Sequence, residues 1–145
     1  MNAVSRLFDR FTAGLSSARL AAPAPRFVVI NLTRNVQLAT SVELATTSRK
    51  RSKGLLGRSG LGQGEGLWIA PCESVHTFGM RFAIDLVYLD KQHRVRKIRR
   101  NVPPWRISAC LAAHSVLELA AGAIREQDAQ PGDQIELIAV NAQTT

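Results

Sequence analysis

Residues 83–102, "AIDLVYLDKQHRVRKIRRNV", predict a β-hairpin. The first half, "AIDLVYLD" (83–90), is rich in the β-branched and aromatic residues that favour strands. The second half, "RVRKIRRNV" (94–102), places valine and isoleucine among basic residues. Asp90 opens the connection between them, and aspartate is common where a tight turn begins. Pro103 and Pro104 then end the second strand, because proline cannot donate to a strand ladder.

Other short apolar runs predict more strands. They are "FVVINL" (27–32), "SVELAT" (41–46), "GLWIA" (66–70), "HSVLELAAG" (114–122) and "QIELIAV" (134–140). One internal helix is expected over residues 46–60, where Thr47 or Ser48 can cap the first turn. Short strands at this spacing predict a mainly β fold, a compact sandwich or barrel with one or two short helices.

Residues 1–25 differ from the rest of the chain. Apolar residues recur at helical spacing over residues 2–20, so an amphipathic helix is expected there. "AAPAP" (21–25) then predicts a stiff linker. We therefore expect a leader over 1–25 and a single β-rich domain over 26–145. The leader can lie on an anionic membrane surface, dock on a partner, or remain a free terminus.

The composition limits the cellular location and the binding partners that we expect for the protein. No apolar run reaches the roughly 18–20 residues of a membrane span, and Arg6, Asp9 and Arg10 interrupt any signal-peptide core. We expect a cytoplasmic protein, with peripheral membrane attachment through the leader as an alternative and export left open. Two cysteines are too few for a disulfide framework. A net charge of +8 favours non-specific contact with anionic surfaces, while nucleic-acid binding lacks the usual interleaved aromatic residues.

Four blocks of sequence resemble one known family. They are "RSKGLLGRSGLGQGEGLWI" (51–69), "HTFGMRFAIDLVYLD" (76–90), "NVPPWR" (101–106), and "VLELAAG" (116–122) with "PGDQIEL" (131–137). In this order they resemble the domain of unknown function 192 family, over about residues 36–140. The resemblance implies a β sandwich or barrel of jelly-roll type, found in bacteria and archaea, and no known activity.

A soft-metal site is one interpretation of "APCESVHTFGM" (70–80). Cys72, His76 and Met80 follow one another at intervals of four residues. A thiolate, an imidazole and a thioether suit copper, and two of them suit zinc. A blue-copper site would need a second histidine, and only His93 and His114 could supply it. The alternative is that Cys72 and Met80 are core residues.

A hydrolase-like enzyme is a second interpretation. His76 could act as a general base with Asp85 or Glu118 beside it, or could activate Cys72 as a nucleophile. Both carboxylates lie inside apolar strands, where a charge is costly unless it is paired. For Asp85 and Glu118 the favoured alternative is therefore a structural role, in an ion pair or bonded to turn backbone.

A binding module is the third and favoured interpretation. Trp105 and Arg106 stand on a rigid loop, where the ring can stack on a ligand and the guanidinium can hold an anion. We expect the loop after Cys72 to reach the rim near Trp105. The predicted pocket for a small molecule or a protein partner is lined by His76, Met80, Asp85, Trp105, Arg106 and Glu118.

Overall fold

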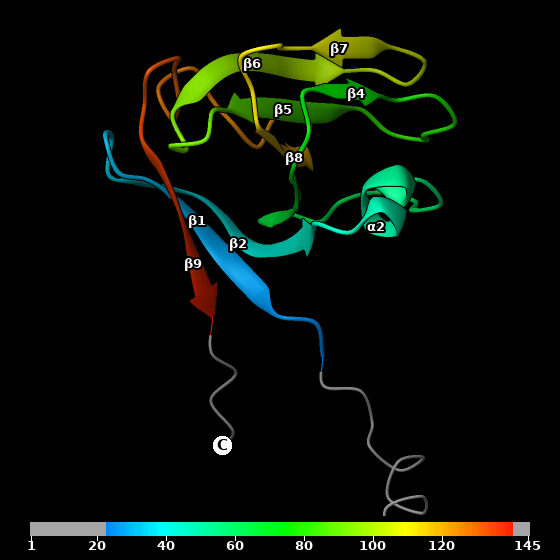
Figure 1. Ribbon diagram of the computed structural model, residues 1–145, viewed down its shortest axis with the longest axis horizontal. Helices are drawn as coiled ribbons and strands as arrows, with labels where there is room; N and C mark the ends of the chain where they lie inside the picture. The colour runs from blue at the N-terminus through cyan, green and yellow to red at the C-terminus, as the bar shows by residue number, and fades with distance from the viewer. Residues whose placement is uncertain (1–22, 141–145) are drawn as a thin grey trace, which may run out of the picture.

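The computed structural model describes residues 23–140, and the predicted helix over 2–20 lies outside that range. Its elements in chain order are β1 (Arg26–Asn31), β2 (Val36–Ala45), α2 (Ser48–Lys53), β3 (Glu65–Ile69), β4 (Ser74–His76), β5 (Ile84–Leu89), β6 (Val95–Val102), β7 (Ile107–Ala109), β8 (Ser115–Ala120) and β9 (Ile135–Val140). The prediction of a mainly β chain with one short internal helix is confirmed (Figure 1).

Seven strands form one mixed sheet in the order β6-β5-β8-β3-β2-β1-β9. The edge strands β6 and β9 do not pair with each other, so the sheet is not closed. An isolated bridge between Arg94 and Gln134 and a few backbone hydrogen bonds join only their first residues and the turns before them. Of the predicted sandwich or barrel, the closed barrel is therefore wrong. The jelly-roll topology is also not formed, because β2 and β3 run parallel. A parallel pair needs a long crossover, and residues 46–64, which include α2, provide it.

The local predictions hold where a turn or cap signal was strong. β5 and β6 pair as the expected hairpin, and the Asp90 carboxylate accepts hydrogen bonds from the backbone of Gln92 and Arg94. Thr47 caps α2 as expected, but the helix ends at Gly54, which has a positive φ of 48°. The predicted helix over 46–60 was therefore too long.

Two three-residue strands, β4 and β7, were not predicted. They pair only with each other, antiparallel, as a separate two-stranded ribbon. Three residues are too short to show a period of two, so no pattern marked them. The ribbon brings His76 opposite Ile107, and Thr77 bonds the backbone of Arg106. The loop after Cys72 thus lies beside Trp105, as the sequence predicted.

Each side of the large sheet carries its own apolar cluster. Val87, Leu117 and Trp68 belong to the first cluster. Leu67, Leu86 and Val116 alternate with them on the same strands and belong to the second. We call the side with the second cluster the cavity face. The β4–β7 ribbon covers part of this face, since Val75 packs in the same cluster, and α2 lies nearby (Figure 1).

Candidate functional site

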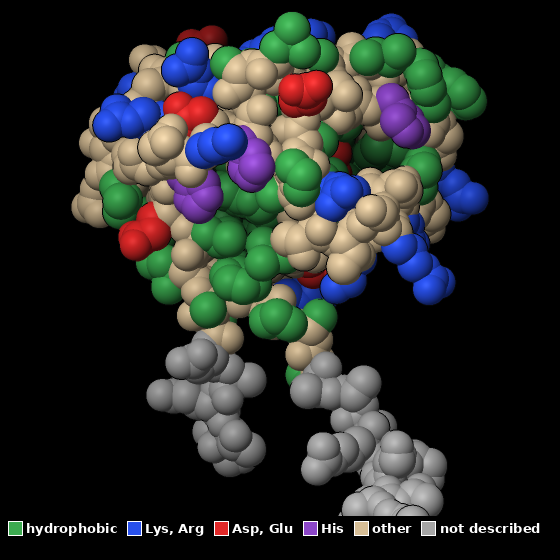
Figure 2. All heavy atoms as spheres, in the orientation of Figure 1, with side chains coloured by type: hydrophobic (Ala, Val, Ile, Leu, Met, Phe, Trp, Pro, Cys, Tyr) green, Lys and Arg blue, Asp and Glu red, His purple; other side chains and the backbone are tan. Residues whose placement is uncertain are grey.

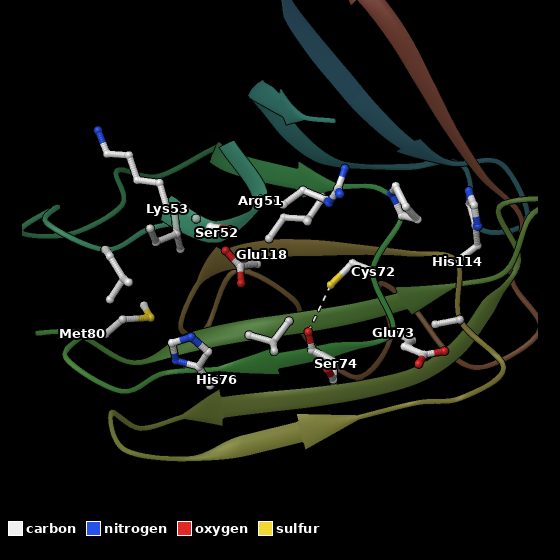
Figure 3. A pocket seen from close by; sticks show the side chains of 17 residues that line it. Arg51, Ser52, Lys53, Cys72, Glu73, Ser74, His76, Met80, His114 and Glu118 are labelled. Atoms are coloured by element: carbon white, nitrogen blue, oxygen red, sulfur yellow. Dashed lines mark hydrogen bonds between the residues drawn. The ribbon is translucent and has the colours of Figure 1, made fainter. Parts of the chain in front are cut away.

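A cavity of about 520 Å³ opens on the cavity face between α2, β4 and β8. Figure 2 shows the surface hollowed there, with hydrophobic side chains inside and basic and histidine side chains beside it. Leu55, Leu56, Ile69, Val75 and Met80 supply apolar walls. The polar lining is Arg51, Ser52, Lys53, Cys72, Glu73, Ser74, His76, His114 and Glu118 (Figure 3).

Glu118 reaches the cavity from the middle of β8 (Figure 3) and is the most buried polar residue of the lining. The residue is 3% exposed. Its cross-strand neighbours are Leu67 and Leu86, whose side chains can donate no hydrogen bond. Glu118 Oε2 has no hydrogen-bond partner among the described residues. A buried polar atom without a partner is rare in folded proteins and calls for an explanation.

Burial controls the ionisation of this carboxyl group. Desolvation raises the pKa of Glu118 to about 7 from its ordinary value of 4.5, and the positive charge of Arg58 only partly opposes the rise. Arg58 itself binds Glu43, at 2.7 Å between Nη2 and Oε2. Glu118 therefore changes charge near neutral pH, where it can donate a hydrogen bond when protonated and accept one when ionised.

The outer lining of the cavity is basic. Arg51 and Lys53 come from α2, and Glu73 is the one other carboxylate in the lining. His114 lies at the other end of the cavity from Lys53 (Figure 3). Arg51 and Lys53 both line the cavity because the short helix ends beside it, although Lys53 is exposed and Arg51 is only partly buried.

Cys72, His76 and Met80 all line the cavity. The Cys72 thiol donates to the backbone carbonyl of Ser74 at 3.1 Å. Within residues 23–140, no three His, Cys, Asp or Glu side chains are grouped closely enough to hold a metal ion. His93, one proposed second histidine, instead packs edge-on against Trp68. The copper or zinc site therefore gains no support from the geometry and stays a prediction.

The nucleophile interpretation of Cys72 meets an electrostatic obstacle. Burial raises the pKa of the Cys72 thiol, and the neighbouring Glu118 adds to the rise. Nucleophilic cysteines need the opposite shift, because the thiolate is the reactive form. Cys72 is thus a packed thiol in the wall of the cavity.

Asp85 does not belong to the cavity. It is fully buried, and its two carboxylate oxygens accept hydrogen bonds from the backbone N–H groups of Asn101, Gly122 and Ile124. This is the turn-binding role that the sequence left open. The predicted pairing of His76 with Asp85 does not form, because both oxygens face these turns. His76 and Glu118 line the same cavity without a hydrogen bond between them.

An aromatic row leads from the cavity to the outer surface. The His76 and Phe78 rings stack with their centroids 5.4 Å apart, and Phe78 lies 5.9 Å from Trp105. Trp105 is 65% exposed and does not line the cavity. Arg106 donates to the carbonyl oxygens of Pro104 and Trp105 and also lies outside it. The predicted pocket therefore divides into a cavity and an external aromatic surface.

Sequence reasoning missed several lining residues. Arg51, Lys53, Glu73 and Ser52 were not proposed for the site. Glu73 and Ser74 stand between Cys72 and His76, so their place follows from the same segment. Arg51 and Lys53 carried no signal, since basic residues on a short helix are usually solvated.

No helix among the described residues is long and apolar enough to cross a membrane.

Two basic side chains of strand β6 form hydrogen bonds within the protein. Lys97 donates to the carbonyl of Ala109, and Arg100 donates to the carbonyls of Ile124 and Ala129. Binding of anionic surfaces or nucleic acid stays a prediction.

Known proteins share this fold and sequence pattern. A UPF0127 protein of Thermococcus gammatolerans is 33% identical over 114 residues, which cover 74% of this chain and 73% of that protein. The UPF0127 protein of Pyrococcus abyssi is 31% identical over 118 residues, 77% of this chain and 97% of that one.

Two crystal structures have the same fold. One is a candidate transcription regulator from Sinorhizobium meliloti, with a TM-score of 0.68 and 23% identity over 78% of this chain and 92% of that one. The other is a protein of unknown function from Novosphingobium aromaticivorans, with a TM-score of 0.67 and 26% identity over 83% and 96%. The sequence model of the domain of unknown function 192 family, described as an uncharacterised ACR, matches residues 29–137. The chain therefore belongs to that family.

Proposed function

We propose that this protein is a small-molecule-binding module whose ligand occupies the cavity between α2, β4 and β8. The observation that carries the proposal is the buried Glu118 carboxyl in the lining of that cavity, whose Oε2 has no hydrogen-bond partner among the described residues. Leaving a buried polar group without a partner costs about 1–3 kcal/mol. A ligand that supplies the missing hydrogen bond would recover that cost in the bound state.

The dimensions and lining suit such a role. Ligand sites are commonly clefts of about 300–1,000 Å³ with apolar walls and a few placed polar groups. This cavity has a volume of about 520 Å³, and Leu55 and Met80 are among the residues of its apolar walls. Polar side chains complete the lining. The row of His76, Phe78 and Trp105 extends the site outward and offers aromatic faces to a longer ligand.

Fragment screening by NMR tests the proposal. We expect small polar-apolar fragments to shift the backbone amide signals of Cys72, Val75 and Glu118. The Ser52→Trp variant should block binding, because Ser52 is exposed and lines the cavity. Ser59→Trp is the matched control, since Ser59 is exposed and lies outside the cavity. Fragments that bind elsewhere, or whose binding survives Ser52→Trp, would contradict the proposal.

An enzyme is the second candidate, and one observation favours it. A carboxyl group with a pKa of about 7 in a cavity is suited to general acid–base catalysis at neutral pH. The two functions differ in outcome: a binding module returns its ligand unchanged, whereas an enzyme converts it at a rate that Glu118→Gln abolishes. Incubation of any cavity-binding fragment with the protein, followed by mass spectrometry, separates them.

A further inference from the structure

The basic groups at the cavity are not neutralised by the protein. Arg51 donates to the backbone carbonyl of Thr46 at 2.7 Å and to Ser48 Oγ, and both acceptors are uncharged. Among the described residues, neither Arg51 nor Lys53 forms an ion pair. The two side chains extend in different directions from α2 (Figure 3), and Arg51 is the one whose charge acts on Cys72 in the cavity wall. A ligand anion can therefore pair with Arg51 without displacing a carboxylate.

The inner end of the cavity has different chemistry. Glu118 lies there among Leu67, Leu86 and Val116 and has no partner for Oε2. The charged and titratable groups that interact with it electrostatically are Arg58 and Cys72, and those elsewhere in the cavity lining are Arg51, Lys53, Glu73, His76 and His114. Apart from Glu118, these groups include one carboxylate, Glu73, and several basic side chains. A cation entering the cavity would therefore meet repulsion before it reached Glu118.

From this arrangement we infer that the cavity binds a small organic carboxylate with an uncharged hydroxyl or carbonyl group at its other end. The carboxylate pairs with Arg51, the apolar body packs on Leu55, Ile69 and Met80, and the uncharged polar end bonds Glu118. This ligand class rests on the proposed binding function. A hydroxyl group suits Glu118 in either ionisation state, because it can both donate and accept.

Four matched compounds test the ligand class. We would titrate the full chain with 6-hydroxyhexanoate, hexanoate, 6-aminohexanoate and 1,6-hexanediol at neutral pH and follow the amide signals of the cavity residues. 6-Hydroxyhexanoate should bind best. Hexanoate should bind about tenfold more weakly because it leaves Glu118 unpaired, and the diol should lose a similar factor without its anion. The amino compound should bind most weakly.

Single variants test which residue binds each end of the ligand. Arg51→Gln should weaken 6-hydroxyhexanoate severalfold and leave the diol unchanged. Arg49→Gln is the matched control, since Arg49 lies on the same helix and outside the cavity lining. Glu118→Leu should erase the preference for 6-hydroxyhexanoate over hexanoate, whereas Glu118→Gln should keep it, because an amide can still bond a hydroxyl group. An unfolding curve of each variant separates loss of binding from loss of the fold.

The outcomes separate this inference from the proposed function. If uncharged fragments bind the cavity but the carboxylates do not, the ligand class is wrong and the binding function stands. If 6-aminohexanoate binds best, especially above pH 7, the inner end accepts a cation and the class is also wrong. If neither the fragments nor these four compounds shift any cavity signal, both proposals fail.

Discussion

Asp85 and Glu118 are buried carboxyl groups on adjacent strands of one sheet, yet their surroundings differ completely. Asp85 accepts hydrogen bonds from three backbone N–H groups. Glu118 has apolar cross-strand neighbours and an unpartnered Oε2. The first carboxylate holds two turns in place. The second adds nothing of that kind to the fold and lies at a cavity, so the comparison separates a structural acid from one available to a ligand.

The largest expected effect follows removal of the structural acid. Asp85→Ala leaves the N–H groups of Asn101, Gly122 and Ile124 without their acceptor. The first two of these hydrogen bonds are partly buried and the third is buried. We expect the free energy of unfolding to fall by about 4 kcal/mol, since each orphaned buried donor costs about 1–3 kcal/mol. Urea unfolding followed by circular dichroism measures the loss. A loss below about 1 kcal/mol would show that these bonds are dispensable and would end the contrast with Glu118.

The next largest effect is the pH dependence that Glu118 imposes. A carboxyl group whose folded pKa is raised stabilises the fold fully below its unfolded pKa and loses that contribution as the pH rises through the folded value. For Glu118 these values are 4.5 and about 7. Between them, the wild type should lose about 3 kcal/mol of unfolding free energy relative to Glu118→Gln.

Urea unfolding of the wild type and of Glu118→Gln over this pH range measures the difference in their free energies of unfolding. The glutamine variant keeps the size of the side chain and removes its titration, so the other carboxyl groups cancel in the difference. Parallel stability curves for the two proteins would mean that Glu118 titrates as an ordinary surface glutamate.

Much of the fold could be predicted from the sequence, because turn and cap signals are local. Asp90 marked the β5–β6 hairpin and Thr47 marked the start of α2. Glu118 could be named as a candidate because a charge inside "VLEL" is conspicuous. Its difference from Asp85 could not be predicted, since both stand in apolar strands and only the tertiary structure shows which one meets backbone donors. The parallel β2–β3 pairing and the β4–β7 ribbon depend on contacts distant in sequence in the same way.

A smaller effect of opposite sign is expected at Asp133, a third buried acid. Desolvation would raise its pKa, but hydrogen bonds from Arg34, Asn31 and Gln130 lower the pKa below 3.8 overall. Its contribution is therefore present above pH 3.8 and is lost as the pH falls through the lowered value. Asp133→Asn should cost about 2 kcal/mol at neutral pH and flatten the acid limb of the stability curve. An unchanged acid limb would place Asp133 outside the class of partnered acids.

The most direct measurement is the ionisation of Glu118 itself. The side-chain carboxyl signal of ¹³C-labelled glutamate, assigned by comparison with Glu118→Gln, can be followed by NMR from acid to mildly basic pH. The absence of a hydrogen-bond donor and the apolar neighbours predict a midpoint of about 7. A midpoint at or below 4.5 would mean that the carboxylate is solvated or paired. Glu118 would then lack no hydrogen-bond partner that a ligand could supply.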